Sequence, residues 1–539
     1  MSDSPTESAG SRERDGVTTI APPRESAGGP PPHAGAAPAQ SFTHREILFM
    51  ISGTVAGMFL GALDQTIVST ALPAMVGELH GMELMSWTVS AYLLTSTAST
   101  PIYGKLSDIY GRSALFRAAI AIFLTGSIVC GAAQNMTMLI AGRAVQGLGG
   151  GGLISLAMTI IADIVPPRER GRYQAYFTSV WSTATVGGPL LGGILVDALS
   201  WRWVFWINLP IGAAALLICG AALKRLPRPG RTKPIDFLGA ALLVPAIVAL
   251  LLVTTWAGST LPWTSPVIVG LVALAVILIA FLVLQELHAD DPLLPPRLFR
   301  HNVVVLGNAI AFLSGAAAVG ATIYLPLFLQ VVIGASASNS GLLILPYMIG
   351  ITAGATATGR LVRYTGRYKP FPLGGFALAA LAFFFFILVN RTTPAFIYGT
   401  AMALMGIGIG PMGPAVTIAV QNAVERRDMG TATSLTSFYR SMGGSFGVAL
   451  MGALLLAGLT DAGRGAVSPA GLLHGGPAMI AALPDALRTA VIAGFTHSFR
   501  YLYATGGVIC AAAALCALLM KELPLRSRLP PPEPEAKRP

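Results

Sequence analysis

Three charged side chains stand within long apolar stretches of this chain: Asp64, Arg143 and Arg440. An ionisable group in such a stretch loses hydration, so it is usually paired, faces a wet interior or takes part in proton movement. Burial raises the pKa of a carboxyl group and a nearby guanidinium lowers it. This chemistry predicts reversible proton binding at Asp64, with Arg143 as counter-ion or relay and Arg440 as a secondary candidate. The alternative is structural: the acid braces a neighbouring helix, and the arginines bond to backbone carbonyls.

Other kinds of chemistry have no support in the sequence. It has no GxxxxGK[ST] loop for ATP phosphates, no HExxH zinc motif and no hydrolytic triad. Gly147, Gly149 and Gly152 fit GxGxxG, but no strand precedes them, so close helix packing explains them better than a dinucleotide site. The four cysteines lack the spacing of metal or disulfide sites and are expected to be buried: Cys130, Cys219, Cys510 and Cys516. We therefore expect no enzyme activity, no cofactor and no metal, and an ion gradient as the energy source.

The elements that hold these residues are apolar segments long enough to cross a membrane. Hydrophobic residues make up 54% of the 539 positions and charged residues 11%, against roughly 25% charged in soluble proteins. A membrane helix needs about 20 mostly apolar residues. The sequence predicts an all-α polytopic membrane protein with fourteen spans: 47–75, 86–106, 114–133, 137–162, 173–199, 203–222, 235–256, 266–287, 303–330, 338–361, 372–390, 394–420, 430–457 and 500–520.

The basic residues predict the orientation of these spans. Segments that face the cytoplasm carry an excess of Lys and Arg. The two tails and the loops after even-numbered spans hold 28 of the 35 basic residues. We therefore expect both termini in the cytoplasm, and we attribute the net charge of +11 to topology rather than to nucleic-acid binding. Residues 1–43 are expected to form a disordered cytoplasmic tail and residues 523–539 a second cytoplasmic tail.

The chain contains an internal repeat. GKLSDIYGR at 104–112 recurs as GRLVRYTGR at 359–367. Two similar six-span halves are typical of secondary transporters, whose substrates bind between the halves. A purely structural membrane protein with repeated halves is the alternative. The predicted parts are an N-terminal half (44–222), a linker with two additional spans (223–296) and a C-terminal half (297–522).

Several motifs together resemble the major facilitator superfamily, and within it the fourteen-span drug:proton antiporter branch of EmrB/QacA type. The resemblance covers roughly residues 45–522, and its most specific part is the loop GKLSDIYGR. Ser69 and Ala184 stand where the branch usually has Asn and Gly. The other matching segments are LDQTIVSTALP (63–73), AGRAVQGLGGGG (141–152), TVGGPLLGG (185–193) and SWRWVFWINLPIG (200–212).

The resemblance implies proton-coupled antiport by alternating access. It places Arg143 beside the first span, where it would act with Asp64. It also implies hydrophobic or cationic drugs as substrates and the bacterial inner (plasma) membrane as location. The implied partners are protons, small molecules and the bilayer, with a periplasmic adaptor and an outer-membrane channel left open. The alternatives are an exporter of one dedicated metabolite, lipid or siderophore, and a non-transporting membrane sensor or scaffold.

The loop between the second and third spans is predicted to act as a conformational latch. Its glycines would permit a tight turn and close helix approach, and Arg112 could pair with Asp163. The resemblance implies that Asp108 faces the N-terminus of span thirteen near Gly430, where the helix dipole favours an anion. Charges that only set topology are the alternative. The predicted latch consists of Gly104, Asp108, Gly111, Arg112 and Asp163.

Span five carries two further candidate features. Small residues allow close packing and proline kinks a helix, and the resemblance associates such a bend with exporters. A structural bend without directional meaning is the alternative. Trp181 is predicted to pack, with substrate contact as its alternative role. The residues of the predicted bend are Gly188, Pro189, Gly192 and Gly193.

A long outer segment is predicted at 459–495. Its Ala-, Leu- and Ile-rich part, 478–495, could form an amphipathic hairpin at the membrane surface. A hairpin of this kind would favour an amphiphilic or lipid-like substrate. A tolerated insertion is the alternative.

Overall fold

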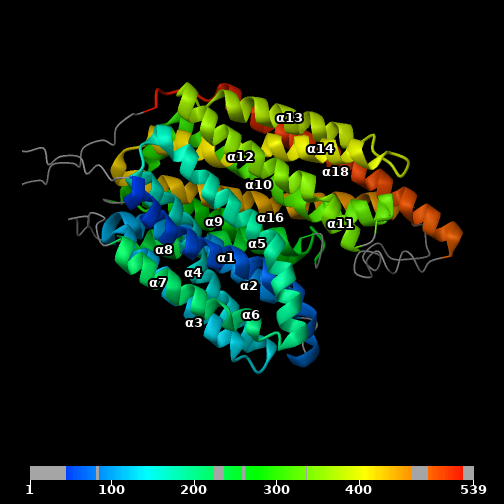
Figure 1. Ribbon diagram of the computed structural model, residues 1–539, viewed down its shortest axis with the longest axis horizontal. Helices are drawn as coiled ribbons and strands as arrows, with labels where there is room; N and C mark the ends of the chain where they lie inside the picture. Colours follow the sequence, from blue (N-terminus) through cyan, green and yellow to red (C-terminus); the bar gives the residue numbers. More distant parts are fainter. Residues whose placement is uncertain are drawn as a thin grey trace, which may run out of the picture. The chain divides into compact units, whose positions relative to one another are not determined.

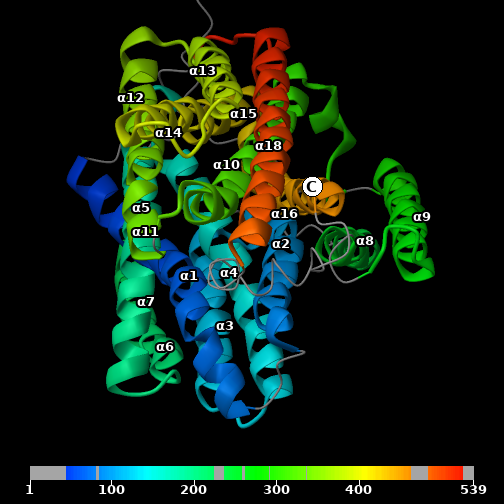
Figure 2. The same ribbon diagram turned by 90° about the vertical axis from the view of Figure 1, so that its right-hand side faces the viewer.

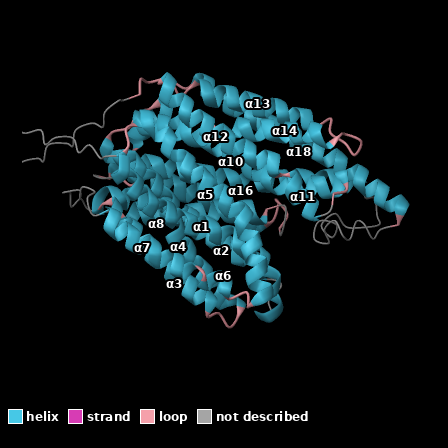
Figure 3. Cartoon of the chain, viewed as in Figure 1, coloured by secondary structure: helices cyan, strands magenta, loops and turns pink. Residues whose placement is uncertain are grey.

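The computed structural model describes residues 44–79, 84–223, 236–257, 261–289, 292–335, 337–462 and 484–525. These residues are almost entirely helical (Figures 1 and 3), and the one pairing of extended backbone among them is an isolated bridge between Ala257 and Leu261. The predicted all-α class is confirmed. The tail at 1–43 and residues 526–539 of the second tail lie outside the described residues.

The N-terminal half is a bundle in which α4 is central. α4 packs against α2 and α3, and α1 packs against α5 and α7 (Figure 2). The glycine run of α4 permits this closeness, because a Cβ on Gly149 would lie 2.5 Å from both the backbone oxygen of Ala119 and the backbone nitrogen of Phe123. The helices are α1 (His44–Leu79), α2 (Met85–Tyr110), α3 (Arg112–Gly131), α4 (Met136–Ile164), α5 (Pro167–Ala198), α6 (Trp203–Trp206) and α7 (Asn208–Ala222).

The C-terminal half repeats these contacts with its own helices. α14 packs against α12 and α13, and α10 packs against α16 and α18, so the pattern of contacts agrees with the internal sequence repeat. The elements are η3 (Pro296–Arg300), α10 (Asn302–Phe328), η4 (Leu329–Ile333), α11 (Ala337–Leu343), α12 (Leu345–Thr365), α13 (Pro370–Phe386), α14 (Ala395–Ile409), η5 (Met412–Val416), α15 (Thr417–Ala423), η6 (Arg426–Asp428), α16 (Met429–Ala462) and α18 (Asp485–Leu519).

Two inserted helices, α8 (Phe237–Trp256) and α9 (Pro266–His288), separate the halves in sequence. They pack against each other, and α8 also contacts α2 and α16 (Figure 2). Much of α9 exposes apolar side chains such as Val276 and Leu287. Lipid tails are as apolar as these side chains, so this surface suits a bilayer. The halves themselves meet through α2 with α16 and through α5 with α12.

Each predicted span coincides with a helix or with consecutive helices. Within the described ranges, nine helical stretches are long and apolar enough to cross a membrane. The helices α2, α5, α12 and α16 are not among the nine, and they are rich in Ser, Thr and Gly. Such residues lower hydropathy but suit helices that pack on one another. α13 is apolar and shorter, and the count of fourteen spans stays a prediction.

The outer segment differs from its prediction. α16 continues to Ala462 and α18 begins at Asp485, so 459–462 and 485–495 extend the neighbouring spans. The predicted hairpin is wrong for 485–495, because that stretch is one continuous helix. It contains good helix formers and no proline, so the helix of span fourteen continues through it. Residues 463–483 lie outside the described residues.

Candidate functional site

Asp64 and Arg143 form a buried ion pair in the N-terminal half. Nη1 of Arg143 in α4 lies 2.5 Å from Oδ2 of Asp64 in α1, and the two side chains expose 2% and 0% of their surface. Arg143 also donates from Nε to the backbone oxygen of Thr88 at 3.1 Å. Its guanidinium lies over the ring of Tyr92, 4.4 Å from the centroid. The structure therefore brings the two predicted proton-coupling residues into direct contact.

Two buried side-chain amides donate hydrogen bonds to the other carboxylate oxygen of Asp64. Nε2 of Gln146 and Nδ2 of Asn208 each donate to Oδ1 of Asp64 at 2.9 Å. The same amide nitrogens lie 2.7 and 3.2 Å from the hydroxyl oxygen of Ser127. Gln146 accepts a further hydrogen bond from Arg143 at 2.8 Å through Oε1. Asp64 thus receives hydrogen bonds from Arg143, Gln146 and Asn208, an arrangement that matches an ionised carboxylate.

Proton binding at Asp64 would disturb this arrangement. A proton turns one carboxylate oxygen into a hydroxyl donor and removes the negative charge, so the hydrogen bonds from Arg143, Gln146 and Asn208 would weaken. The charge attraction to Arg143 would also be lost. Because the three donors come from α4 and α7 and the acid from α1, the change would act between helices. Proton binding at Asp64 would therefore weaken contacts that join α1 to α4 and α7.

Gln146 and Asn208 are absent from the predicted site, although the sequence carries a signal for each. Gln146 follows Arg143 by three residues, which places both on one face of a helix. Asn208 is an isolated amide in the apolar stretch that follows Trp206. Ser127 has no comparable signal, because a lone serine is common in packed membrane helices.

Gly188 of the predicted bend lies beside this site. Thr66, two residues after Asp64, donates to the backbone oxygen of Ala184 at 2.8 Å. A Cβ on Gly188 would overlap the hydroxyl of Thr66, so α1 and α5 meet closely only because residue 188 lacks a side chain. The bend itself stays a prediction, since α5 is one continuous helix through all four residues: Gly188, Pro189, Gly192 and Gly193.

The latch residues lie together at the junction of α2 and α3. Arg112 contacts Oδ1 of Asp108 at 2.5 Å and Oδ2 of Asp163 at 2.8 Å. It also donates to the hydroxyl of Ser107 at 2.6 Å. Gly111 joins the helices with a φ of 91°, a conformation that favours glycine. Burial raises the pKa of the Asp108 carboxyl, and the Arg112 guanidinium opposes that shift.

Asp108 also accepts hydrogen bonds from residues of the C-terminal half. Its carboxylate accepts hydrogen bonds from the backbone nitrogens of Gly430 at 3.2 Å and Thr431 at 3.1 Å, and from the hydroxyl of Thr431 at 3.1 Å. These donors belong to the first turn of α16, where the helix dipole favours an anion. A Cβ on Gly104 would lie 2.6 Å from the Ser434 hydroxyl and 2.9 Å from the backbone oxygen of Gly430. Glycine at 104 therefore lets α2 approach α16 closely enough for the Asp108 contact.

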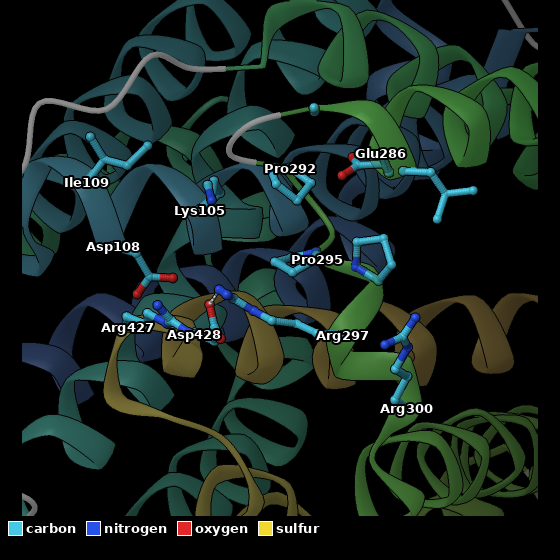
Figure 4. A pocket seen from close by; sticks show the side chains of 13 residues that line it. Lys105, Asp108, Ile109, Glu286, Pro292, Pro295, Arg297, Arg300, Arg427 and Asp428 are labelled. Carbon is cyan, nitrogen blue, oxygen red and sulfur yellow. Dashed lines mark hydrogen bonds and ion pairs between the residues drawn. The ribbon is translucent and has the colours of Figure 1, made fainter.

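A pocket of about 410 Å³ lies beside the latch (Figure 4). Lys105 and Asp108 line it from α2, and Glu286 lines it from α9. Arg297 and Asp428 of the C-terminal half line it too and form an ion pair at 2.8 Å. The latch is therefore the place where both halves and the inserted helices meet.

The two secondary candidates differ in their surroundings. Trp181 is partly buried and packs against the apolar core of the N-terminal half, which supports its packing role. Arg440 in α16 is also partly buried. Within the described part of the chain, no charged or hydrogen-bonding group acts on its guanidinium. Arg440 therefore makes no ion pair with Asp64.

Residues 54–448 match the family model described as Major Facilitator Superfamily. The chain belongs to this superfamily. Major facilitator proteins are transporters and not enzymes, so the chain is a multi-pass membrane transporter of small molecules.

Similar proteins support this assignment. The chain is 38% identical to an uncharacterized MFS-type transporter of Mycobacterium tuberculosis, over 94% of this chain and 73% of that protein. It is 34% identical to the multidrug transporter protein MdtP of Bacillus subtilis, over 89% of this chain and 94% of that protein. The solved structure of the proton:xylose symporter XylE matches with a TM-score of 0.58 at 13% identity, over 88% of this chain and 95% of that chain; this likeness shows the fold alone. At a coarse level, the relatives support drug efflux by a major facilitator transporter.

Proposed function

We propose that this major facilitator protein is a proton-coupled antiporter of the fourteen-span drug export branch. It exports hydrophobic compounds by alternating access. Cationic drugs are included among its substrates because the family resemblance implies them. The observation that carries the proposal is the buried Asp64–Arg143 pair, whose contacts join helices α1, α4 and α7. The name of the relative MdtP, a multidrug transporter, supports the direction of transport.

In the proposed cycle, a proton from outside binds Asp64 as substrate leaves. The hydrogen bonds to the neutral acid then weaken, and the halves reorient. The proton leaves to the cytoplasm as the next substrate binds, which restores the ion pair with Arg143. The latch formed by Asp108, Arg112 and Asp163 joins the halves in the outward-facing state and separates when the transporter opens inward.

We place this transporter in a bacterial plasma membrane with both termini in the cytoplasm. The distribution of basic residues supports that orientation. A periplasmic adaptor and an outer-membrane channel are the partners that such a location allows. The proposed substrates enter from the bilayer or the cytoplasm and leave on the outer side.

Uptake into inverted vesicles tests the proposal. The vesicles carry an acidic lumen, and the probes are cationic ethidium, zwitterionic norfloxacin and anionic pyrene-1-sulfonate. We expect ΔpH-dependent uptake of at least one probe by the parent protein and at least a tenfold loss in Asp64→Asn. Glu78→Gln is the matched control, because Glu78 lies on the same helix and its side chain is 51% exposed.

Two outcomes would contradict the proposal. Unchanged ΔpH dependence of uptake in Asp64→Asn would show that Asp64 is not the proton-coupling residue. Absence of ΔpH-dependent uptake for every probe would favour a sensor or scaffold over an antiporter.

A further inference from the structure

The charged side chains at membrane depth are few and unbalanced. Asp64, Arg143 and Arg440 are the charged residues that lie more than one helical turn inside the predicted spans. Asp64 and Arg143 neutralise each other in their buried pair. Arg440 adds one positive charge, and protonation of Asp64 leaves a second on Arg143. The interior therefore carries a net positive charge in both protonation states.

Arg440 lies deep in the bundle and between the halves. α16 contacts α2 and α4 of the N-terminal half and α10 and α18 of the C-terminal half (Figure 2). Arg440 stands eleven residues beyond Met429, the first residue of α16, or about 16 Å along the helix. This is roughly half the thickness of a bilayer core of about 30 Å.

Two flanks of α16 around Arg440 are occupied by other helices. On one flank, the Thr436 hydroxyl donates to Oδ1 of Asn308 in α10 at 2.9 Å. On another, Leu435 and Phe438 belong to an apolar cluster with residues of α2 and α8. Arg440 follows Thr436 by four residues, and a Cβ on Gly315 of α10 would overlap the backbone oxygen of Arg440, so Arg440 lies at the edge of the α10 contact. Its side chain is partly exposed there.

The surface of α16 beside the α10 contact is polar and partly open. Ser437, Arg440 and Ser441 follow the spacing i, i+3 and i+4, which places them on one face of α16. Ser437 and Arg440 are partly exposed and Ser441 is exposed. Arginine and serine at this depth do not suit contact with lipid tails. The face therefore suits a polar space inside the protein.

We propose that Arg440 binds the acidic group of the transported compound, so that the preferred substrates are hydrophobic organic anions. No charged or hydrogen-bonding group within the described residues acts on the Arg440 guanidinium. Its planar fork of N–H donors suits a carboxylate, sulfonate or phosphate. The proposal rests on the proposed export function and ranks hydrophobic anions above cationic drugs among its substrates.

The charge of the substrate determines how transport responds to membrane potential. One proton moving inward while one monovalent anion moves outward transfers two positive charges inward. One proton exchanged for one monovalent cation transfers none. A potential that is negative inside the cell therefore accelerates export of the anion and leaves exchange of the cation unchanged.

A matched pair of probes tests the proposal in inverted vesicles. Pyrene-1-sulfonate and (1-pyrenylmethyl)trimethylammonium share an aromatic core and carry permanent opposite charges, so ΔpH does not alter their ionisation. We expect the parent protein to take up the anion at least tenfold faster than the cation. A lumen-positive potential, set with potassium and valinomycin, should accelerate uptake of the anion. These two measurements need no variant.

Variants of Arg440 then test whether this residue determines the preference for the anion. Arg440→Gln should raise the half-saturating concentration of the anion at least tenfold and leave that of the cation unchanged, whereas Arg440→Lys should stay within about threefold of the parent. Arg500→Gln is the control, because Arg500 is an exposed arginine at the start of span fourteen. Faster uptake of the cation by the parent, or equal effects of Arg440→Gln on both probes, would overturn the proposal. In either case, the proposed export function would remain supported if uptake still depended on ΔpH and on Asp64.

Discussion

At the residue scale, Gln146 stabilises the ionised pair in two ways. It donates to Asp64 and accepts from Arg143, and leucine at this position would remove both contacts. A hydrogen bond to a charged group contributes about 1.5–3 kcal/mol, so the variant holds Asp64 and Arg143 together less firmly. We expect Gln146→Leu to lower the initial rate of ΔpH-dependent uptake about tenfold, measured in inverted vesicles.

A second polar residue of α4 provides the control for this change. Ser155 is also fully buried, but its hydroxyl donates to the backbone oxygen of Gly151 within α4. Ser155→Ala should keep the uptake rate of the parent. Equal uptake rates of Gln146→Leu and Ser155→Ala would show that Gln146 does not support the Asp64–Arg143 pair.

At the scale of helices, the approach of α2 to α16 depends on Gly104. A Cβ there would lie 2.6 Å from the Ser434 hydroxyl and 2.9 Å from the backbone oxygen of Gly430. The backbone oxygen cannot turn aside, so the helices must separate, and overpacking of this kind costs about 1–3 kcal/mol. We expect Gly104→Ala to lower the initial rate of uptake about tenfold and to lower the melting temperature of the purified protein.

Two companion variants make this prediction specific. Gly270→Ala in α9 should be neutral, because no atom lies within 4 Å of the added Cβ. Ser434→Gly added to Gly104→Ala should restore part of the rate, because it removes the nearest atoms and leaves the oxygen of Gly430. Equal activity of Gly104→Ala and Gly270→Ala would show that the helices tolerate separation here.

At the scale of the whole molecule, an even number of spans places both termini on one side of the membrane. The inserted helices α8 and α9 preserve this relation because they add two spans together. We expect green fluorescent protein fused to the C-terminus to fluoresce in the cytoplasm. Alkaline phosphatase should be active when fused after residue 470 and inactive when fused after residue 368, in the loop that follows span ten.

This whole-chain prediction depends on the number of spans. An odd number would leave the C-terminal fluorescent protein dark and would reverse the result of one phosphatase fusion. Because Lys and Arg set orientation through short loops, the two phosphatase sites fall in loops with opposite predicted sides. The same fusions therefore check the orientation and the parity of the spans.

Much of the helical architecture follows from local properties of the chain. Apolar runs predict helices such as α4 and α8, and the repeated loop at 104–112 and 359–367 predicts two similar halves. Apolar runs do not predict the full length of α18, which begins fifteen residues before the predicted span 500–520. A window of about 20 residues finds the part of a helix that crosses the bilayer, whereas the extension of α18 to Asp485 depends on helix propensity in the segment before that part.

For the site, the sequence by itself determined the ionisable residues Asp64 and Arg143, because a charge in an apolar stretch is visible without knowledge of its neighbours. Only the tertiary structure decided that Gln146 and Asn208 complete the shell around Asp64 and that Arg440 stands apart from it. Contacts between residues so distant in sequence depend on which faces of the helices pack together. Those faces are selected by the fit of all the helices at once, and a single segment does not contain that information.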